Sequence, residues 1–195
     1  QAQASGGLLV KTIGGPSVKP YQPSGLWQEV SGHKYQPDKG DSLYRRTMYT
    51  FFKRSVAPPA MMAFDAAGRE ACVVRETRTN TPLQALNLLN DATYIEAARK
   101  MAERVIVEGG KTQRERLNYA FRLAVGRRAH PAELRILTAG LESHRERYQS
   151  DAEAAKQLLS VGEAPLRENL EASEVAAYTA IANLILNLDE VITKE

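Results

Sequence analysis

The polar residues that could do chemistry gather in one stretch, between Asp65 and Asn80. The candidates for a binding site there are Asp65, Arg69, Glu70, Arg78 and Asn80. One interpretation is a loop held to the body by arginine–carboxylate pairs, because a long irregular segment must satisfy its backbone groups. The other is a polar pocket, in which Arg78 and Asn80 donate hydrogen bonds to an anion or an acidic partner beside a helix N-terminus. We predict the structural role.

Aromatic residues form a second candidate site. Tyr21, Trp27, Tyr35 and Tyr44 lie in or next to a segment rich in glycine and proline. These rings can anchor the segment on the helices. They can also form an aromatic platform for a sugar or a partner protein, since Trp and Tyr combine apolar area with a polar group. The exposure of the rings distinguishes the two interpretations.

No motif of an enzyme class accompanies these residues. A glycan hydrolase that used Asp65 and Glu70 would need the two carboxylates about 5 to 10 Å apart across an open cleft. The sequence has no nucleophile elbow, phosphate-binding loop or metal motif. Its single cysteine excludes a disulfide framework and a haem attachment motif, and its three histidines lack ligand spacing. We therefore expect no catalytic residue, metal or cofactor in this chain.

The composition is that of a globular protein. Of the 195 residues, 43% are hydrophobic and 25% are charged, which is enough for one substantial core. The formal charge is +3, but basic residues are interleaved with acidic ones, so we expect no nucleic-acid binding. The longest apolar run, near residues 181–188, is too short to span a membrane. The start at Gln1, without a methionine, indicates a piece of a longer protein.

The elements that position the polar stretch are predicted to be helices. Thr81, Pro82 and Gln84 have the spacing of a capping box, with proline at the first helical position. The leucine-rich residues that follow predict a short helix buried on all sides. Asp91 begins a longer helix that ends at Gly109.

Further helix signals recur along the chain. On the helix after Asp91, the pairs Glu96–Lys100 and Arg99–Glu103 are predicted to lie on the outer face. The other predicted helices cover residues 41–54, 112–126, 131–148, 152–161 and 173–188. We predict an all-α fold, an irregular helical bundle of about six helices, with a Pro/Gly-rich, aromatic N-terminal arm. Residues 1–40 would form this arm, which wraps on the body, and residues 41–195 a single helical domain.

Five segments resemble a known family. They are GGPSVKPYQPSGLWQEV, LYRRTMYTFFKR, FDAAGRE, RTNTPLQALNLLND and LNLDEVITKE. Together they resemble the C-terminal domain of unknown function, of the PSD-one type, in large planctomycete cytochrome-c-like proteins. The resemblance implies an exported protein, periplasmic or on the cell surface, with haem only in an upstream domain. It also implies a setting near polysaccharide degradation, and it transfers no catalytic residue.

Three function classes follow from these observations. The first is an interaction or packing module that docks on upstream domains of the same protein, and we prefer it because a fold alone implies no activity. The second is a glycan-binding module with a polysaccharide as its partner. The third is a carboxylate-dependent glycan hydrolase.

Overall fold

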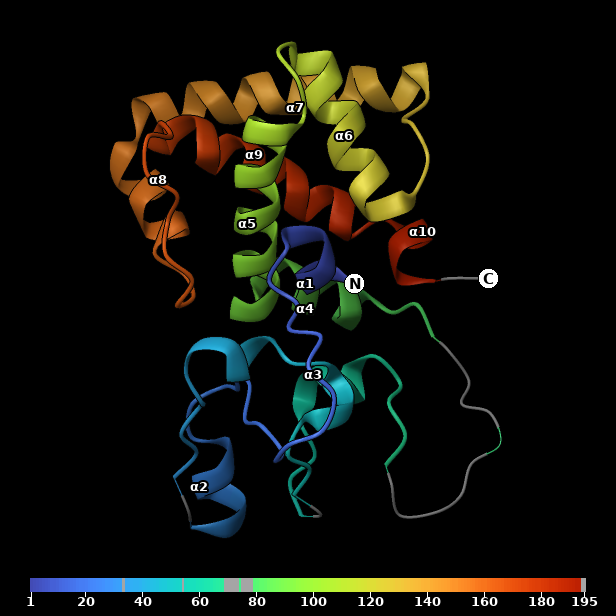
Figure 1. The fold of residues 1–195 in the computed structure, drawn as a ribbon, viewed down its shortest axis with the longest axis vertical. Coiled ribbons are helices and arrows are strands. Elements are labelled where there is room, and N and C mark those ends of the chain that lie inside the picture. Colours follow the sequence, from blue (N-terminus) through green and yellow to red (C-terminus); the bar gives the residue numbers. More distant parts are fainter. Residues whose placement is uncertain (33, 54, 69–73, 75–78, 194–195) are drawn as a thin grey trace. The chain divides into compact units, whose positions relative to one another are not determined.

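The computed structural model describes residues 1–32, 34–53, 55–68, 74 and 79–193 (Figure 1). Within these ranges the regular structure is helical, and the only β-pairing consists of the isolated bridges Val10–Arg45, Val18–Thr50 and Lys53–Val56. The prediction of an all-α fold is confirmed. The short helices are α1 (Ala2–Gly6), α2 (Leu26–Ser31), η1 (Gly40–Tyr44), η2 (Thr47–Tyr49), α3 (Pro59–Ala63) and α10 (Asp189–Ile192). The longer helices are α4 (Pro82–Asn90), α5 (Ala92–Glu108), α6 (Gln113–Val125), α7 (Pro131–Ser150), α8 (Ala152–Leu159) and α9 (Ala172–Leu186).

The chain divides into two compact units. One, here called the bundle unit, comprises Gln1–Leu8 and Leu88–Glu195, and the other, here called the loop unit, comprises Leu9–Asn87. The division at residue 40 that composition suggests stays a prediction.

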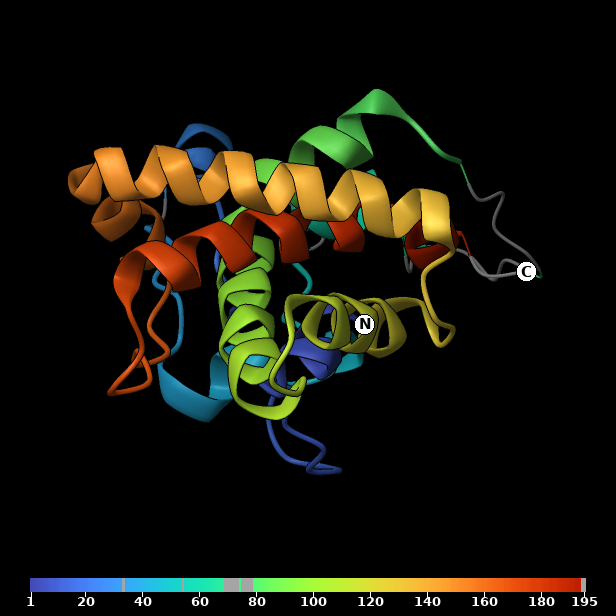
Figure 2. The same ribbon diagram turned by 90° about the horizontal axis from the view of Figure 1, so that it is seen from above.

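In the bundle unit, α9 is the central helix. It contacts α5, α6, α7, α8 and α10. Both views show α7 and α9 side by side and α5 running across them (Figures 1 and 2). The larger buried side chains of this core are Met101, Val105, Leu117, Phe121, Leu141, Tyr178, Ile181 and Ile185. Leu184 lies on the solvent side of α9 and is 44% exposed.

Side-chain caps begin the bundle helices where the sequence places them. The Asp91 carboxylate accepts from the Thr93 N–H at 2.8 Å and caps α5. At α6 the Thr112 hydroxyl accepts from the Glu115 N–H at 3.2 Å, while the Glu115 carboxylate accepts from the Thr112 N–H at 2.9 Å. This reciprocal pair is a capping box. No helix in the described ranges is long and apolar enough to cross a bilayer.

Three charged residues that were predicted on the outer face of α5 are buried instead. Glu96 and Arg99 are each 1% exposed, and Glu103 is 2% exposed. Arg99 lies 3.7 Å from a Glu96 oxygen and 3.6 Å from a Glu103 oxygen, and it donates a hydrogen bond to the Ala164 carbonyl at 2.7 Å. The Glu96 carboxylate accepts from the Ala164 N–H at 2.6 Å. The loop between α8 and α9 therefore covers this face of α5.

The described part of the loop unit consists mainly of segments without regular secondary structure, joined by short helices. The helix predicted over residues 41–54 is wrong, because two 3-10 turns, η1 and η2, lie there instead. The reason is that this stretch forms backbone hydrogen bonds with residues 10–18. The Val10 N–H donates to the Tyr44 carbonyl at 2.9 Å, and the Val18 N–H donates to the Tyr49 carbonyl at 2.8 Å. Arg45 also donates to backbone carbonyls of residues 12–16.

Candidate functional site

The predicted polar stretch is described at Asp65 and Asn80, whereas Arg69, Glu70 and Arg78 lie outside the described residues. Asp65 has a positive φ of 54° and accepts from the Thr79 N–H at 2.6 Å and from the Thr79 hydroxyl at 2.8 Å. Asn80 is exposed and has an interaction partner. The Asp65 carboxylate thus holds Thr79, which lies two residues before the cap of α4. This geometry agrees with a structural role for Asp65, and the role of the whole cluster stays a prediction.

The capping box at the start of α4 is confirmed. The Thr81 N–H donates to the Gln84 side-chain oxygen at 3.0 Å, and the Gln84 N–H donates to the Thr81 hydroxyl at 3.4 Å. The Gln84 amide also donates to the Thr79 hydroxyl at 3.3 Å. Asp65, Thr79, Thr81 and Gln84 therefore form one hydrogen-bonded network, and Gln84 is the buried centre of it.

The remainder of α4 differs from the helix buried on all sides that its leucines predict. Gln84 and Leu88 are 1% and 5% exposed, whereas Leu83 and Leu86 are 61% and 58% exposed and Leu89 is 45% exposed. With 100° between successive residues, these three leucines span about 120° of the helix surface. In α4 the usual placement is inverted, with a glutamine buried and leucines exposed. The capping network explains this inversion, because it holds Gln84 in the buried position. The helix turns an apolar face, here called the α4 leucine face, to the solvent.

The four aromatic residues of the second candidate site lie in the loop unit, and two of them are buried. Trp27 and Tyr44 are both 8% exposed, while Tyr21 and Tyr35 are half-buried. The ring centroids of Trp27 and Tyr35 lie 4.9 Å apart, edge to face, and the Lys53 ammonium lies 4.6 Å from the Trp27 ring centroid. The Tyr35 hydroxyl donates to the carbonyl of Pro20, and burial is the larger cause that raises the pKa of Tyr35. The proposed platform role for these rings stays a prediction.

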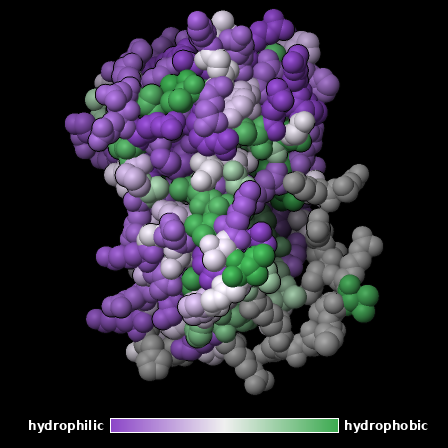
Figure 3. All heavy atoms as spheres, viewed as in Figure 1, coloured by the Kyte–Doolittle hydropathy of each residue, from purple (hydrophilic) through white to green (hydrophobic). Residues whose placement is uncertain are grey.

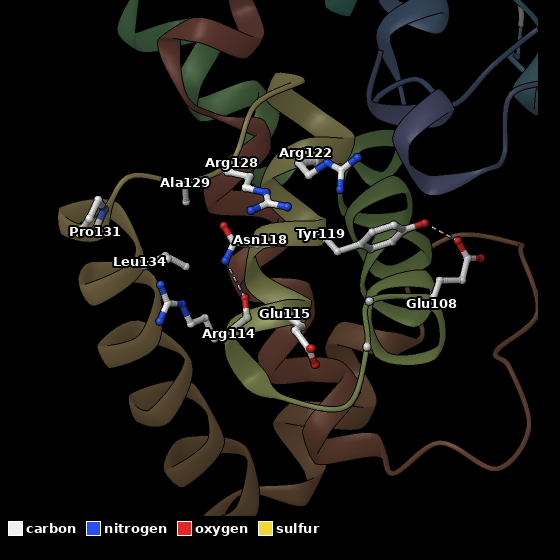
Figure 4. A pocket seen from close by; sticks show the side chains of 12 residues that line it. Glu108, Arg114, Glu115, Asn118, Tyr119, Arg122, Arg128, Ala129, Pro131 and Leu134 are labelled. Atoms are coloured by element: carbon white, nitrogen blue, oxygen red, sulfur yellow. Dashed lines mark hydrogen bonds between the residues drawn. The ribbon is translucent and has the colours of Figure 1, made fainter.

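The bundle unit contains a pocket that the sequence reasoning missed. Its volume is about 500 Å³, and it lies between the end of α5, one face of α6 and the start of α7 (Figure 4). Arg114, Asn118 and Arg122 project from α6 at intervals of four residues, and Arg128 comes from the turn that joins α6 to α7. The opposite wall is apolar and is formed by Ala129, Pro131 and Leu134. Three polar residues at intervals of four along one helix face were the available sequence signal.

The acidic groups of this pocket wall are already engaged. Glu115 accepts from the N–H groups of Lys111 and Thr112 at 3.0 and 2.9 Å, and these bonds, led by those from Thr112, lower the pKa of Glu115. Glu108 accepts from the hydroxyl of Tyr119, and this bond, followed by one from Arg104, lowers the pKa of Glu108. Both carboxylates therefore stay charged, with their oxygens used in bonds to the protein.

The pocket arginines differ from these two carboxylates, whose oxygens are used in bonds to the protein. Arg114, Arg122 and Arg128 form no side-chain hydrogen bond or ion pair with any residue in the described part of the chain. The ion-paired arginines of the bundle unit are Arg99, Arg104, Arg116, Arg127 and Arg145. Among the described residues no group of three or more His, Cys, Asp or Glu side chains could hold a metal ion. The pocket chemistry is that of guanidinium groups beside a small apolar wall.

Comparison with known proteins gives one match. A family model with the description PSD1, protein of unknown function (DUF1553), matches residues 1–141 of the chain. No curated protein and no solved structure matches. The matched range contains the whole of α4 and every residue that lines the pocket.

Proposed function

The chain belongs to the PSD1 family of proteins of unknown function, and from this premise we propose that it is an interaction module that docks on other domains of the same protein. The docking element is the α4 leucine face. The partners are the upstream domains that precede this domain in the cytochrome-c-like proteins it resembles. The whole protein is exported, and its haem belongs to the cytochrome-c-like domain.

The observation that carries this proposal is the inversion of α4. A helix on the surface of a globular domain normally turns its leucines inward and its amides outward. In α4 the Gln84 amide is buried in the capping network while Leu83 and Leu86 are exposed. Leaving two leucine side chains in water forgoes about 1.5 to 3 kcal/mol for each one that could be fully buried. Docking against an apolar surface of another domain recovers this energy.

The rest of the described surface gives a useful contrast. Figure 3 shows that the surface over α6 and α7 is mostly hydrophilic on the face in view. Large exposed apolar residues occur there singly, for example Ile136, which is 63% exposed on α7. Isolated apolar residues of this kind are normal on soluble proteins. Ile136 therefore serves as a matched control for the leucines of α4.

The test is binding in trans. The upstream domains of the full-length protein are expressed separately and titrated with this chain in a calorimeter. The double variant Leu83→Gln/Leu86→Gln should weaken binding by about thirtyfold to several hundredfold, since each exposed leucine has roughly 1 to 2 kcal/mol still to gain. Glutamine suits the test because its helix propensity is close to that of leucine.

The control variant is Ile136→Gln, which should bind as the wild type does. Both variants should keep the wild-type unfolding midpoint, because surface substitutions usually change stability by less than about 0.5 kcal/mol. Equal binding by the wild type and by the α4 variant would refute the proposal. So would a wild-type chain that does not bind the upstream domains at all.

Glycan binding is the alternative function. Because Trp27 and Tyr44 are buried, a platform would use Tyr21 and Tyr35, whose rings are half-buried. Titration with a panel of polysaccharides, repeated with Tyr35→Ala, tests this alternative. A glycan hydrolase is the third candidate, but the Asp65 carboxylate that it would use is held by Thr79.

A further inference from the structure

The pocket between α6 and α7 is lined by arginine side chains from two elements. Arg114 and Arg122 lie eight residues apart on one face of α6, which separates their Cα atoms by about 12 Å along the helix. Arg128 approaches from the turn between the helices, so the guanidinium groups come from two elements (Figure 4). We propose that this pocket binds an organic small molecule that carries at least two oxyanion groups, such as phosphate, sulfate or carboxylate groups.

The charges of the three pocket arginines are available to a ligand. A guanidinium group presents several N–H donors in a planar fork that matches carboxylate, phosphate and sulfate oxygens. Arg127, which is next to Arg128 in sequence, uses its fork on Glu133 at 2.8 Å and on Glu190 at 2.6 Å. Arg114, Arg122 and Arg128 use theirs on no residue of the described ranges. Their donors are therefore available to a ligand.

The acids in the pocket wall form no bonds to these arginines. Carboxylates near unpaired arginines would ordinarily neutralise them. Glu115 is held by the backbone of the α6 capping box, and Glu108 by Tyr119 and Arg104. Their oxygens do not bond to the three pocket arginines, and Arg104 offsets the charge of Glu108. The field inside the pocket is therefore positive, which attracts an anion.

The size and the walls of the pocket suit an organic small molecule. A volume of about 500 Å³ is within the general range for small-molecule sites, which is about 300 to 1,000 Å³. Ala129, Pro131 and Leu134 offer carbon surface opposite the arginines, so the ligand has a carbon skeleton as well as charges. Gly109 and Gly110 line the pocket at the end of α5, where a Cβ added to Gly110 would lie 2.9 Å from the Glu115 side chain.

The spacing of the arginines indicates more than one anionic group. The Cα atoms of Arg114 and Arg122 are about 12 Å apart, so a single oxyanion can contact both guanidinium groups only if both side chains bend toward it. Two oxyanion groups several ångströms apart can be bound with each arginine extended. Phosphate esters and acidic sugars both supply this pattern, and the probes below distinguish them.

The experiment is calorimetric titration of the intact chain with a hexose bisphosphate, with trigalacturonate and with inorganic phosphate. We expect saturable binding at one site for one of the two organic probes. Which of them binds identifies the source of the oxyanion groups. Inorganic phosphate should bind at least tenfold more weakly, because it offers a single group. Binding should also weaken as salt rises, since exposed charges are screened over about 10 Å at 0.1 M.

Two variants with matched loss of charge locate the site. Arg114→Gln/Arg122→Gln should weaken binding of the organic probe at least tenfold. The control Arg135→Gln/Arg147→Gln removes two charges from α7, outside the pocket, and should weaken binding less than threefold. Equal losses in both variants would show a general charge effect and overturn the proposal, as would an absence of saturable binding by either organic probe. Unfolding midpoints of the variants should match the wild type, and Arg128→Gln gives a second variant if the double one is unstable.

Discussion

The buried charges on α5 provide the sharpest test of how the bundle unit is held together. Arg99 is 1% exposed and lies between Glu96 and Glu103, which are also buried. It also donates to the Ala164 carbonyl in the loop that follows α8. We predict that Arg99→Met, which keeps much of the side-chain volume, strongly destabilises the protein. The variant leaves two buried carboxylates without their shared cation and one buried carbonyl without its donor.

The magnitude follows from the contacts. Removing one partner of a buried ion pair generally costs about 3 to 5 kcal/mol. The lower end applies here because Glu96 keeps its bond from the Ala164 N–H, and Glu103 keeps its contact with Lys100. We therefore expect a loss of about 3 kcal/mol in the free energy of unfolding. For a chain of this size this loss lowers the melting temperature by about 6 to 12 °C.

The assay is urea unfolding followed by far-ultraviolet circular dichroism, which reports the helices, with the dependence on urea fitted for each variant. Arg135→Met is the matched control, because Arg135 is exposed on α7. It should change stability by less than about 0.5 kcal/mol. A loss below about 1 kcal/mol for Arg99→Met would refute the reasoning, since it would mean that the buried charges contribute no more than a surface pair.

Three further predictions concern single contacts. Thr81→Ala should cost about 1 kcal/mol by removing the α4 cap, and an unchanged melting temperature would contradict that role. Gly162→Ala should cost at least about 2 kcal/mol in urea unfolding, because φ is +89° and an added Cβ would lie 2.3 Å from the Glu96 carboxylate; a neutral result would contradict this packing. The bond from Arg127 is the largest cause that lowers the pKa of Glu133, to about 2, so its contribution is present above the unfolded pKa near 4.3 and is lost as pH falls toward 2. Melting temperatures between pH 5 and pH 2 should therefore fall less steeply for Glu133→Gln than for the wild type, and parallel curves would contradict the assignment.

Local signals predicted the bundle helices well. The caps at Asp91 and Thr112 and the glycine after α6 are read from a few neighbouring residues, and each lies where the structure begins or ends a helix. Apolar periodicity likewise predicted a helix over residues 173–188, where α9 lies. These features could be predicted because the forces that set them act within one or two helical turns.

The helix predictions that were wrong involve contacts with residues distant in the sequence. Residues 41–54 have helical spacing, but Tyr44 and Tyr49 accept backbone hydrogen bonds from Val10 and Val18, more than 30 residues earlier. Arg99 has the spacing of a surface pair, but the loop at Ala164 covers it. Helix periodicity shows which residues share a face, and it does not show what packs against that face.

The candidate sites show the same limit. The sequence predicted the α4 capping box, but not that Gln84 would be buried and the leucines exposed, because this depends on the network with Thr79 and Asp65. The four-residue repeat of Arg114, Asn118 and Arg122 was readable. The repeat does not show that these charges remain unpaired. This depends on which groups the neighbouring acids bond to.

The most direct test of the proposed docking role measures solvent access at the α4 leucine face. Hydroxyl-radical footprinting, read by mass spectrometry, compares the oxidation rates of Leu83 and Leu86 in this chain alone and in the full-length protein, with Ile136 as the internal control. If α4 docks on the upstream domains, the two leucines should be oxidised several times more slowly in the full-length protein while Ile136 is unchanged. Equal rates for Leu83 and Leu86 in both forms would contradict the account.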